Sequence, residues 1–233
     1  ESQIARVVAY AASQGVKRFA IMTPNSAYGR LVLAAYQESV VKAGGTISQV
    51  TFYDPKSPDL TLPVREMADA YKRSGFDALM IPEGGQRVRA FAAMLPAFEI
   101  PTGLVRLLGT AQWQDPTVAA EPALVGGWFA APAPERFQSF AQRYASLYGS
   151  QPDPRAGIVY DAVTLAAALA QSKEGGDFTT ARMTDPSGFS GITGVFRLSA
   201  DGKTERGLAV MEIAPGTFTV KDPAPTTFAA VIN

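Results

Sequence analysis

The side chains able to do chemistry in this chain are restricted, because its 233 residues include no histidine and no cysteine. Disulfides, thiolate nucleophiles, histidine general bases and zinc sites built from these ligands are therefore excluded. The sequence also contains no G-x-S-x-G elbow, no G-x-x-x-x-G-K phosphate loop and no G-x-G-x-x-G dinucleotide loop. We therefore expect a protein that is not an enzyme and that uses no cofactor or metal.

The strongest candidate for a binding stretch is TPNSAYGR, residues 23–30, which directly follows the apolar run RFAIM. Ser26 can cap a helix that runs to Gly44 and Gly45. In open α/β sheets ligands lie beyond the carboxyl ends of the strands, and exposed amides at a helix N-terminus favour an anionic group such as a carboxylate. Asn25 and Ser26 are therefore candidate ligand contacts, and the alternative is that Ser26 only caps the helix.

Charge and hydropathy exclude two further classes of protein. The chain carries 21 Lys and Arg against 21 Asp and Glu, so it lacks the basic field that a nucleic-acid platform needs. Its longest apolar run, AVTLAAALA, is far shorter than the roughly 20 residues that span a bilayer. The opening residues, ESQIARVVAYAAS, favour a helix over a signal peptide. These totals indicate a globular protein of one large or two small domains.

The elements that must position the candidate site follow one repeated pattern through residues 1–130. A short apolar run is followed by a polar turn and then by an amphipathic segment, such as the one that opens at Thr61 and ends near Gly75. The apolar runs are RFAIM (18–22), ISQVTF (47–52), DALMI (77–81), LVRLL (104–108) and LVGGWF (124–129). Strands that alternate with helices predict an α/β fold, with a parallel sheet flanked by helices in a three-layer αβα arrangement.

The pattern changes in the last hundred residues. Residues 137–148 and 156–170 predict two successive helices with no strand between them. The second of these is apolar nearly all round, so it must be buried on several sides, yet no local strands are available to bury it. Residues 191–222 then predict an antiparallel meander with Asp201-Gly202 and Pro215-Gly216 at its bends.

Three stretches carry a resemblance to a known family. They read VKRFAIMTPNSAYGRLVLAAYQESVVKAGGTI, FDALMIPEGG and RYASLYGSQPDPRAGIVYDAVTLAAALA, and they are spread over residues 16–170. They resemble the type I periplasmic binding proteins of the Leu/Ile/Val-binding-like group, which implies two α/β lobes joined by three crossings. The closing stretch, residues 191–225, is similar to one branch of that group, the penicillin-binding protein activators. These are outer-membrane lipoproteins that serve a peptidoglycan synthase.

The resemblance also implies a division of the chain. Residues 1–132 would form the second lobe, residues 133–172 would be helices of the first lobe, and residues 173–233 would be a return segment with antiparallel strands. The sheet of the first lobe would precede Glu1, so we expect the chain to lack that leading part. Residues 137–170 are then expected to expose an apolar face or to pair with a second copy.

The resemblance places further residues in the site. The tyrosine of the YG element lines the cleft in amino-acid-binding relatives, so Tyr28 is expected to face a ligand; packing against the loop is the alternative. Where such relatives often have a second aromatic, this chain reads PEGGQ, which offers Glu83 and Gly84. Glu83 is either an ammonium partner or an ordinary turn carboxylate. Gln112 lies where relatives often supply an acid, so we expect no branched-chain amino acid in the site.

Two functions remain open at this point. The first is a non-catalytic activator of a penicillin-binding peptidoglycan synthase in the periplasm, anchored as a lipoprotein through an upstream segment; the resemblance of residues 191–225 favours it. The alternative is the solute-binding component of an ABC importer for amino acids or similar small polar ligands, which the intact NSAYG stretch favours. Both share one fold, so only the site can separate them.

Overall fold

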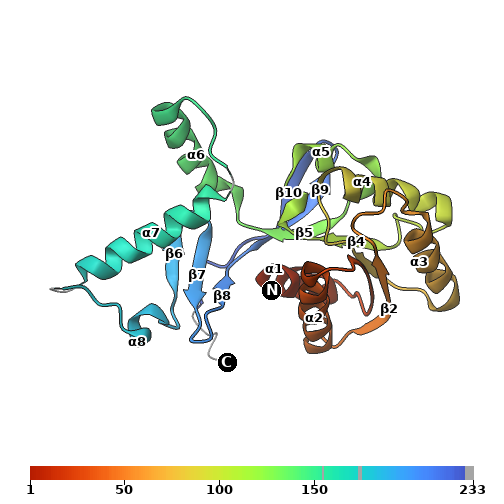
Figure 1. Ribbon diagram of the computed structural model, residues 1–233, viewed down its shortest axis with the longest axis horizontal. Helices are drawn as coiled ribbons and strands as arrows, with labels where there is room; N and C mark the ends of the chain where they lie inside the picture. The colour runs from red at the N-terminus through yellow and green to blue at the C-terminus, as the bar shows by residue number, and fades with distance from the viewer. Residues whose placement is uncertain (154, 173–174, 229–233) are drawn as a thin grey trace. The chain divides into compact units, whose positions relative to one another are not determined.

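The computed structural model describes residues 1–153, 155–172 and 175–228 (Figure 1). These residues divide into two compact units. Unit 1 comprises Glu1, Gln3–Ala131 and Val210–Asp222, and unit 2 comprises Ser2 with the described residues of Pro132–Ala209 and Pro223–Asn233. The chain therefore passes between the units after Ala131, after Ala209 and after Asp222, and neither unit is built from one continuous segment.

A seven-stranded sheet forms the centre of unit 1, in the order β10-β9-β5-β4-β3-β1-β2. Its strands are β1 (Arg18–Pro24), β2 (Thr46–Tyr53), β3 (Ala78–Met80), β4 (Arg106–Gly109), β5 (Trp128–Ala131), β9 (Ala209–Ala214) and β10 (Thr217–Asp222). The pairings among the first five strands, β2 with β1, β1 with β3, β3 with β4 and β4 with β5, are parallel, whereas β9 and β10 pair antiparallel. Strands β1, β3 and β5 are almost wholly buried, as continuous apolar runs predict for a sheet covered on both faces.

Helices flank this sheet (Figure 1). They are α1 (Ser2–Ser13), α2 (Ala27–Lys42), α3 (Thr61–Ser74), α4 (Gly85–Met94) and the short α5 (Pro116–Ala119). Three 3-10 turns complete the connections: Pro96–Phe98, Ala111–Trp113 and Pro122–Leu124. The apolar faces of α3 and α4 are buried, since Val64, Met67, Val88 and Phe91 are fully buried. The α/β prediction for this part of the chain is confirmed.

One glycine sets how closely α2 approaches the end of β1. A Cβ atom added to Gly29 would lie 1.8 Å from the carbonyl oxygen of Pro24 and 3.0 Å from Oγ1 of Thr23. Real Cβ atoms essentially never come within 3.0 Å of such atoms. The glycine of the YG element therefore has a structural cause, because only a residue without a side chain allows the first turn of α2 to lie on the strand end.

The carboxylate of Asp77 joins the amino ends of β1 and β3. Asp77 Oδ2 accepts hydrogen bonds from the backbone N–H groups of Lys17 (3.1 Å) and Arg18 (2.8 Å), and Asp77 Oδ1 accepts from the Arg18 guanidinium at 2.7 Å. Partial burial opposes ionisation of Asp77, but the hydrogen bonds from Arg18 and from the backbone outweigh it and lower the pKa of the carboxyl. The ionised Asp77 carboxylate therefore stabilises the contact between these two strands at the amino edge of the sheet.

Unit 2 combines helices with a small sheet. Its elements are α6 (Pro134–Tyr148), α7 (Ala156–Gln171), α8 (Thr180–Met183), β6 (Phe189–Gly191), β7 (Gly194–Leu198) and β8 (Thr204–Arg206). Strands β6, β7 and β8 form an antiparallel sheet in that order. Among the described residues of α7 only Gly157, Asp161 and Leu169 are buried, while Val163 is 64% exposed. The expected apolar face is thus exposed, and the expectation that several sides of this helix are buried is wrong.

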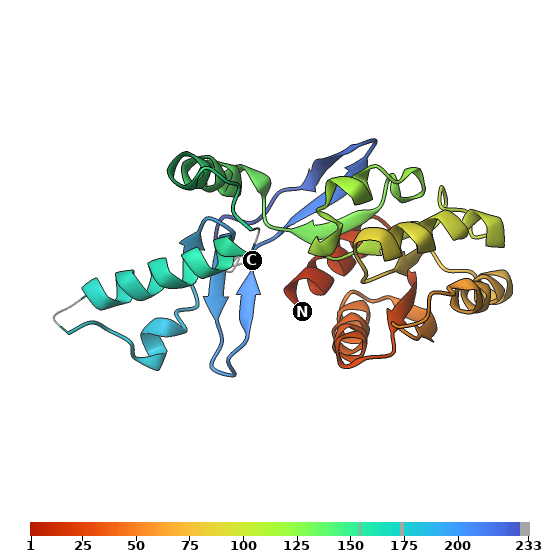
Figure 2. The ribbon, with the colours of Figure 1, turned by 45° about the horizontal axis from the view of Figure 1, so that its top comes forward.

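The antiparallel strands after residue 191 are divided between the two sheets. The turns at Asp201-Gly202 and Pro215-Gly216 lie between paired strands, as expected. However, β8 stays with β7 in unit 2, whereas β9 hydrogen-bonds to the segment leading into β5, with Ile213 N donating to Gly127 O at 2.9 Å. Figure 2 shows β9 and β10, in blue, beside the green β5. The chain changes sheet between Arg206 and Ala209, so the strands do not form one meander.

Candidate functional site

The candidate residues gather at the carboxyl edge of the unit 1 sheet. Strands β1 and β2 end side by side there, with Pro24 paired to Tyr53, and the loops after β3 and β4 leave the same edge because all four strands are parallel. The candidates come from three of these loops: Asn25, Ser26 and Tyr28 after β1, Glu83 and Gly84 after β3, and Gln112 after β4. We call this group the edge cluster.

Tyr28 connects the three loops. Its hydroxyl donates a hydrogen bond to the carbonyl oxygen of Pro82 (3.2 Å) and accepts one from Nε2 of Gln112 (3.0 Å). Tyr28 is nevertheless 43% exposed. Its hydroxyl is therefore held by hydrogen bonds, while part of its ring is accessible to solvent. Partial burial raises the pKa of the Tyr28 phenol, and the charge of Glu83 adds to that rise, so the hydroxyl stays protonated at neutral pH.

Glu83 provides the carboxylate of the edge cluster. The hydroxyl of Tyr53 donates a hydrogen bond to Glu83 Oε1, and the indole Nε1 of Trp113 donates to the Glu83 carbonyl oxygen at 2.9 Å. Tyr53 is buried and packs its ring against Phe91, with centroids 4.9 Å apart. Burial, followed by the bond to Glu83, raises the pKa of Tyr53 far above its ordinary value. The half-buried carboxylate is therefore held by a neutral donor.

Gly84 and Gln112 touch at the same edge. A Cβ atom on Gly84 would lie 3.0 Å from Cβ and 3.1 Å from Oε1 of Gln112. The backbone of Gly84 is extended, so the close approach of Gln112, rather than a special backbone angle, is what favours glycine here. The structure thus brings Tyr28, Glu83, Gly84 and Gln112 into one contiguous group.

Asn25 and Ser26 lie at the same edge but already have local partners. Ser26 Oγ accepts from the backbone N–H of Gly29 at 3.1 Å, which makes it the N-cap of α2 as predicted. Asn25 donates its backbone N–H to Tyr53 O at 2.8 Å, and its Oδ1 accepts from Arg30 at 3.3 Å. Both residues shape the loop, and their contact with a ligand stays a prediction.

Sequence reasoning missed Tyr53. It ends β2 at the same edge and contributes the donor that holds Glu83, yet within an apolar run it could not be distinguished from a core tyrosine. The usable signal was its position at the strand end beside the end of β1. Asp115, by contrast, caps α5 through bonds of 2.7 Å from Thr117 N and Oγ1, so it serves the helix rather than the edge cluster.

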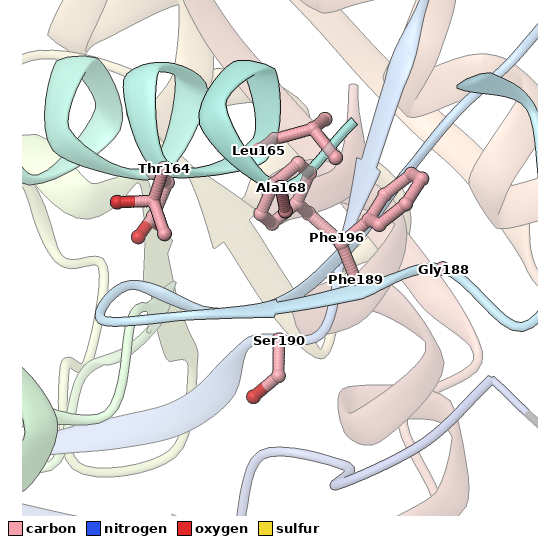
Figure 3. A pocket seen from close by; sticks show the side chains of 8 residues that line it. Thr164, Leu165, Ala168, Gly188, Phe189, Ser190 and Phe196 are labelled. Carbon is pink, nitrogen blue, oxygen red and sulfur yellow. The ribbon is translucent and has the colours of Figure 1, made fainter. Parts of the chain in front are cut away.

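Unit 2 contains a hollow of about 280 Å³ between α7 and the β6–β7 hairpin (Figure 3). Figure 3 shows Leu165 and Ala168 of α7 facing the rings of Phe189 and Phe196. Asp161 also lines it, but its carboxylate already accepts from the backbone N–H groups of Ile192 (2.7 Å) and Thr193 (3.1 Å). That bonding pattern is structural. The hollow therefore offers mainly apolar surface.

The arrangement of unit 1 is suited to binding. Within residues 1–153, 155–172 and 175–228 no group of three or more acidic side chains is placed to hold a metal ion. Over the same residues no helix has the length and apolar character needed to cross a bilayer. The edge cluster supplies a carboxylate, a carboxamide and a tyrosine in fixed positions, which are groups that recognise a small polar molecule.

The sequence matches the family described as periplasmic binding protein over residues 1–217, and the chain belongs to this family. Its members are generally non-catalytic ligand binders, and membership implies a periplasmic location. No curated protein sequence matches the chain.

Solved structures share the fold. A putative branched-chain amino acid ABC transporter from Rhodospirillum rubrum superposes with a TM-score of 0.78 at 20% identity, covering 93% of this chain. A solute-binding protein of R. palustris in complex with benzoate gives 0.69 at 18% identity over 98%. An ABC transporter substrate-binding protein from Desulfitobacterium hafniense in complex with Leu gives 0.69 at 21% over 93%. This chain spans 64% of the length of each of them.

Proposed function

We propose that this chain is part of the solute-binding component of an ABC importer for amino acids or similar small polar ligands, and that it has no catalytic activity. The observation that carries the proposal is the edge cluster. Tyr28 and Gln112 are hydrogen-bonded to each other across two loops while the Tyr28 ring stays 43% exposed. Family membership and the importer proteins among the similar structures support it.

The ligand contacts in this proposal are the six residues of the edge cluster. Asn25 and Ser26 bring the N-terminus of α2, which favours an anionic group, while the Tyr28 ring covers an apolar part of the ligand. Glu83, Gly84 and Gln112 face it from the loops after β3 and β4. Two of the similar structures contain ligands of different kinds, the amino acid leucine and the aromatic acid benzoate. Both carry a carboxylate, so either chemistry fits the α2 terminus.

The activator of a peptidoglycan synthase remains a prediction from residues 191–225, together with lipoprotein anchoring. In that reading the edge cluster would be scaffold, and a surface of the protein would contact the synthase. The assignment of residues 1–132 to a second lobe, of residues 133–172 to a first lobe and of residues 173–233 to a return segment likewise remains a prediction. The importer proposal is preferred because the polar groups of the edge cluster form a connected set at the sheet edge.

A thermal-shift screen of the protein against the twenty amino acids, benzoate and peptidoglycan fragments tests the proposal. A ligand at about 100 times its dissociation constant adds roughly 2.7 kcal/mol to the free energy of unfolding, which moves the melting temperature visibly. We expect a shift with a small solute that is lost in Tyr28→Ala and kept in Tyr148→Ala, a control at an exposed tyrosine of unit 2. A shift with peptidoglycan fragments alone would favour the activator.

A further inference from the structure

We infer that Glu83 makes the edge cluster select ligands that carry a cationic nitrogen over ligands that are only anionic, and that Tyr53 is the residue that positions Glu83. This inference rests on the proposed binding function. It goes further by choosing between the two ligand chemistries, the amino acid and the aromatic acid, on the charge present in this chain.

The Glu83 carboxylate is held at the carboxyl edge. Tyr53 OH donates to Oε1, which leaves Oε2 for another partner, and the bond from Trp113 Nε1 fixes the Glu83 backbone. In the part of the chain that the structure describes, Glu83 forms no ion pair. A half-buried carboxylate without a counter-ion gains most from a ligand that supplies one.

The basic residues nearest in sequence to the cluster are committed elsewhere. The guanidinium of Arg87, in the first turn of α4, donates to the carbonyl oxygens of Pro55 (2.8 Å) and Ser57 (3.3 Å). Arg30 donates to Asn25 Oδ1 at 3.3 Å. Their guanidinium groups keep their charge but form no ion pair with Glu83, whereas the charge of Glu83 acts directly on Tyr28. An ammonium group placed beside Glu83 gains from this carboxylate, whereas the carboxylate of a ligand in the same place is repelled by it.

Tyr53 acts through Glu83. Its ring is buried and packs against the ring of Phe91, so its hydroxyl has a fixed position at the strand end. A neutral donor orients one oxygen of the carboxylate and leaves its negative charge in place. An arginine at the same position would neutralise that charge. Tyr53→Phe therefore leaves the charge and loosens its position, while Glu83→Gln removes the charge and keeps the side-chain shape.

The test measures binding by calorimetry for the twenty amino acids, putrescine, 4-methylpentanoate and benzoate. We expect binding only by compounds with a cationic nitrogen. Glu83→Gln should weaken that binding by about tenfold to a hundredfold, because a hydrogen bond to a charged group contributes about 1.5–3 kcal/mol. Tyr53→Phe should weaken it by about threefold to tenfold and reduce the preference for amines over acids, an effect that lost stability alone would not produce.

Glu99→Gln is the matched control, because it removes the same charge from unit 1 where Glu99 pairs with Lys72 near the end of α3. Its affinities should equal those of the wild type. Binding of 4-methylpentanoate or benzoate that is tighter than that of every amine, or that improves in Glu83→Gln, would overturn the inference and leave the binding proposal standing. No binding by any of these compounds, in the wild type and in all variants, would count against both.

Discussion

The substitution Gly29→Ala tests whether the close contact between α2 and the end of β1 contributes to stability. The new Cβ atom would begin 1.8 Å from Pro24 O and must reach at least 3.0 Å, so the helix has to move by about 1 Å or more. That movement loosens the buried face of α2, which includes Val32, Tyr36 and Val40. Overpacking costs about 1–3 kcal/mol and loosened packing adds to it, while the better helix propensity of alanine returns about 1 kcal/mol. With about 2 kcal/mol for the loosened packing, we expect a net loss of about 2–4 kcal/mol.

Urea denaturation followed by tryptophan fluorescence reports this loss, because both tryptophans, Trp113 and Trp128, belong to unit 1. The midpoint should fall by about 1–2 M. Gly103→Ala is the control, since a Cβ atom there meets nothing within 4 Å; its change should stay within about 0.5 kcal/mol. A Gly29→Ala protein as stable as the wild type would show that α2 can shift freely and would refute the reasoning.

Two further predictions concern single carboxylates. Asp77→Asn should lower the free energy of unfolding at pH 7 by about 1 kcal/mol, a value reduced for partial exposure. Because the folded pKa of Asp77 lies below its unfolded value, this contribution is present above about pH 4 and lost as the pH falls through the folded pKa, so urea midpoints of the two proteins should converge in acid. In unit 2, Gly191→Ala places a Cβ atom 2.3–2.5 Å from the carboxylate of Asp161, which accepts hydrogen bonds from the amides of residues 192 and 193. The carboxylate must move, so both amides should lose protection from hydrogen exchange. Unchanged protection would contradict this prediction.

Periodicity and turn residues were sufficient to predict most elements of unit 1. The run RFAIM became β1, and the cap at Ser26 and the Gly44-Gly45 stop bound α2, because these signals are local. The run at 124–129 was less reliable. Pro122 begins a 3-10 turn and Gly126 has φ 84°, so β5 starts only at Trp128. Apolar character marks burial, but the backbone angles at proline and glycine decide where a strand begins.

Long-range pairing was not predictable in the same way. The turn at Pro215-Gly216 joins β9 to β10 through local chemistry, but which sheet these strands enter depends on the free edge of β5, far away in sequence. The site followed a similar rule. Glu83 and Gln112 could be placed at one edge from strand ends alone, whereas the bond from Tyr53 to Glu83 required the register of β1 against β2.

The divided construction of unit 1 has a consequence for biosynthesis. Strand β5 leaves the ribosome complete at Ala131, but its partner β9 begins at Ala209, after all of residues 132–208 have been made. At about 5–20 residues per second this interval lasts roughly 4 to 15 s. During it the nascent chain presents an unpaired edge of an apolar sheet, which is a template for pairing with other chains. Translation speed through residues 132–208, and the protection of β5 by a chaperone over that interval, should therefore govern how much of the protein reaches its native state.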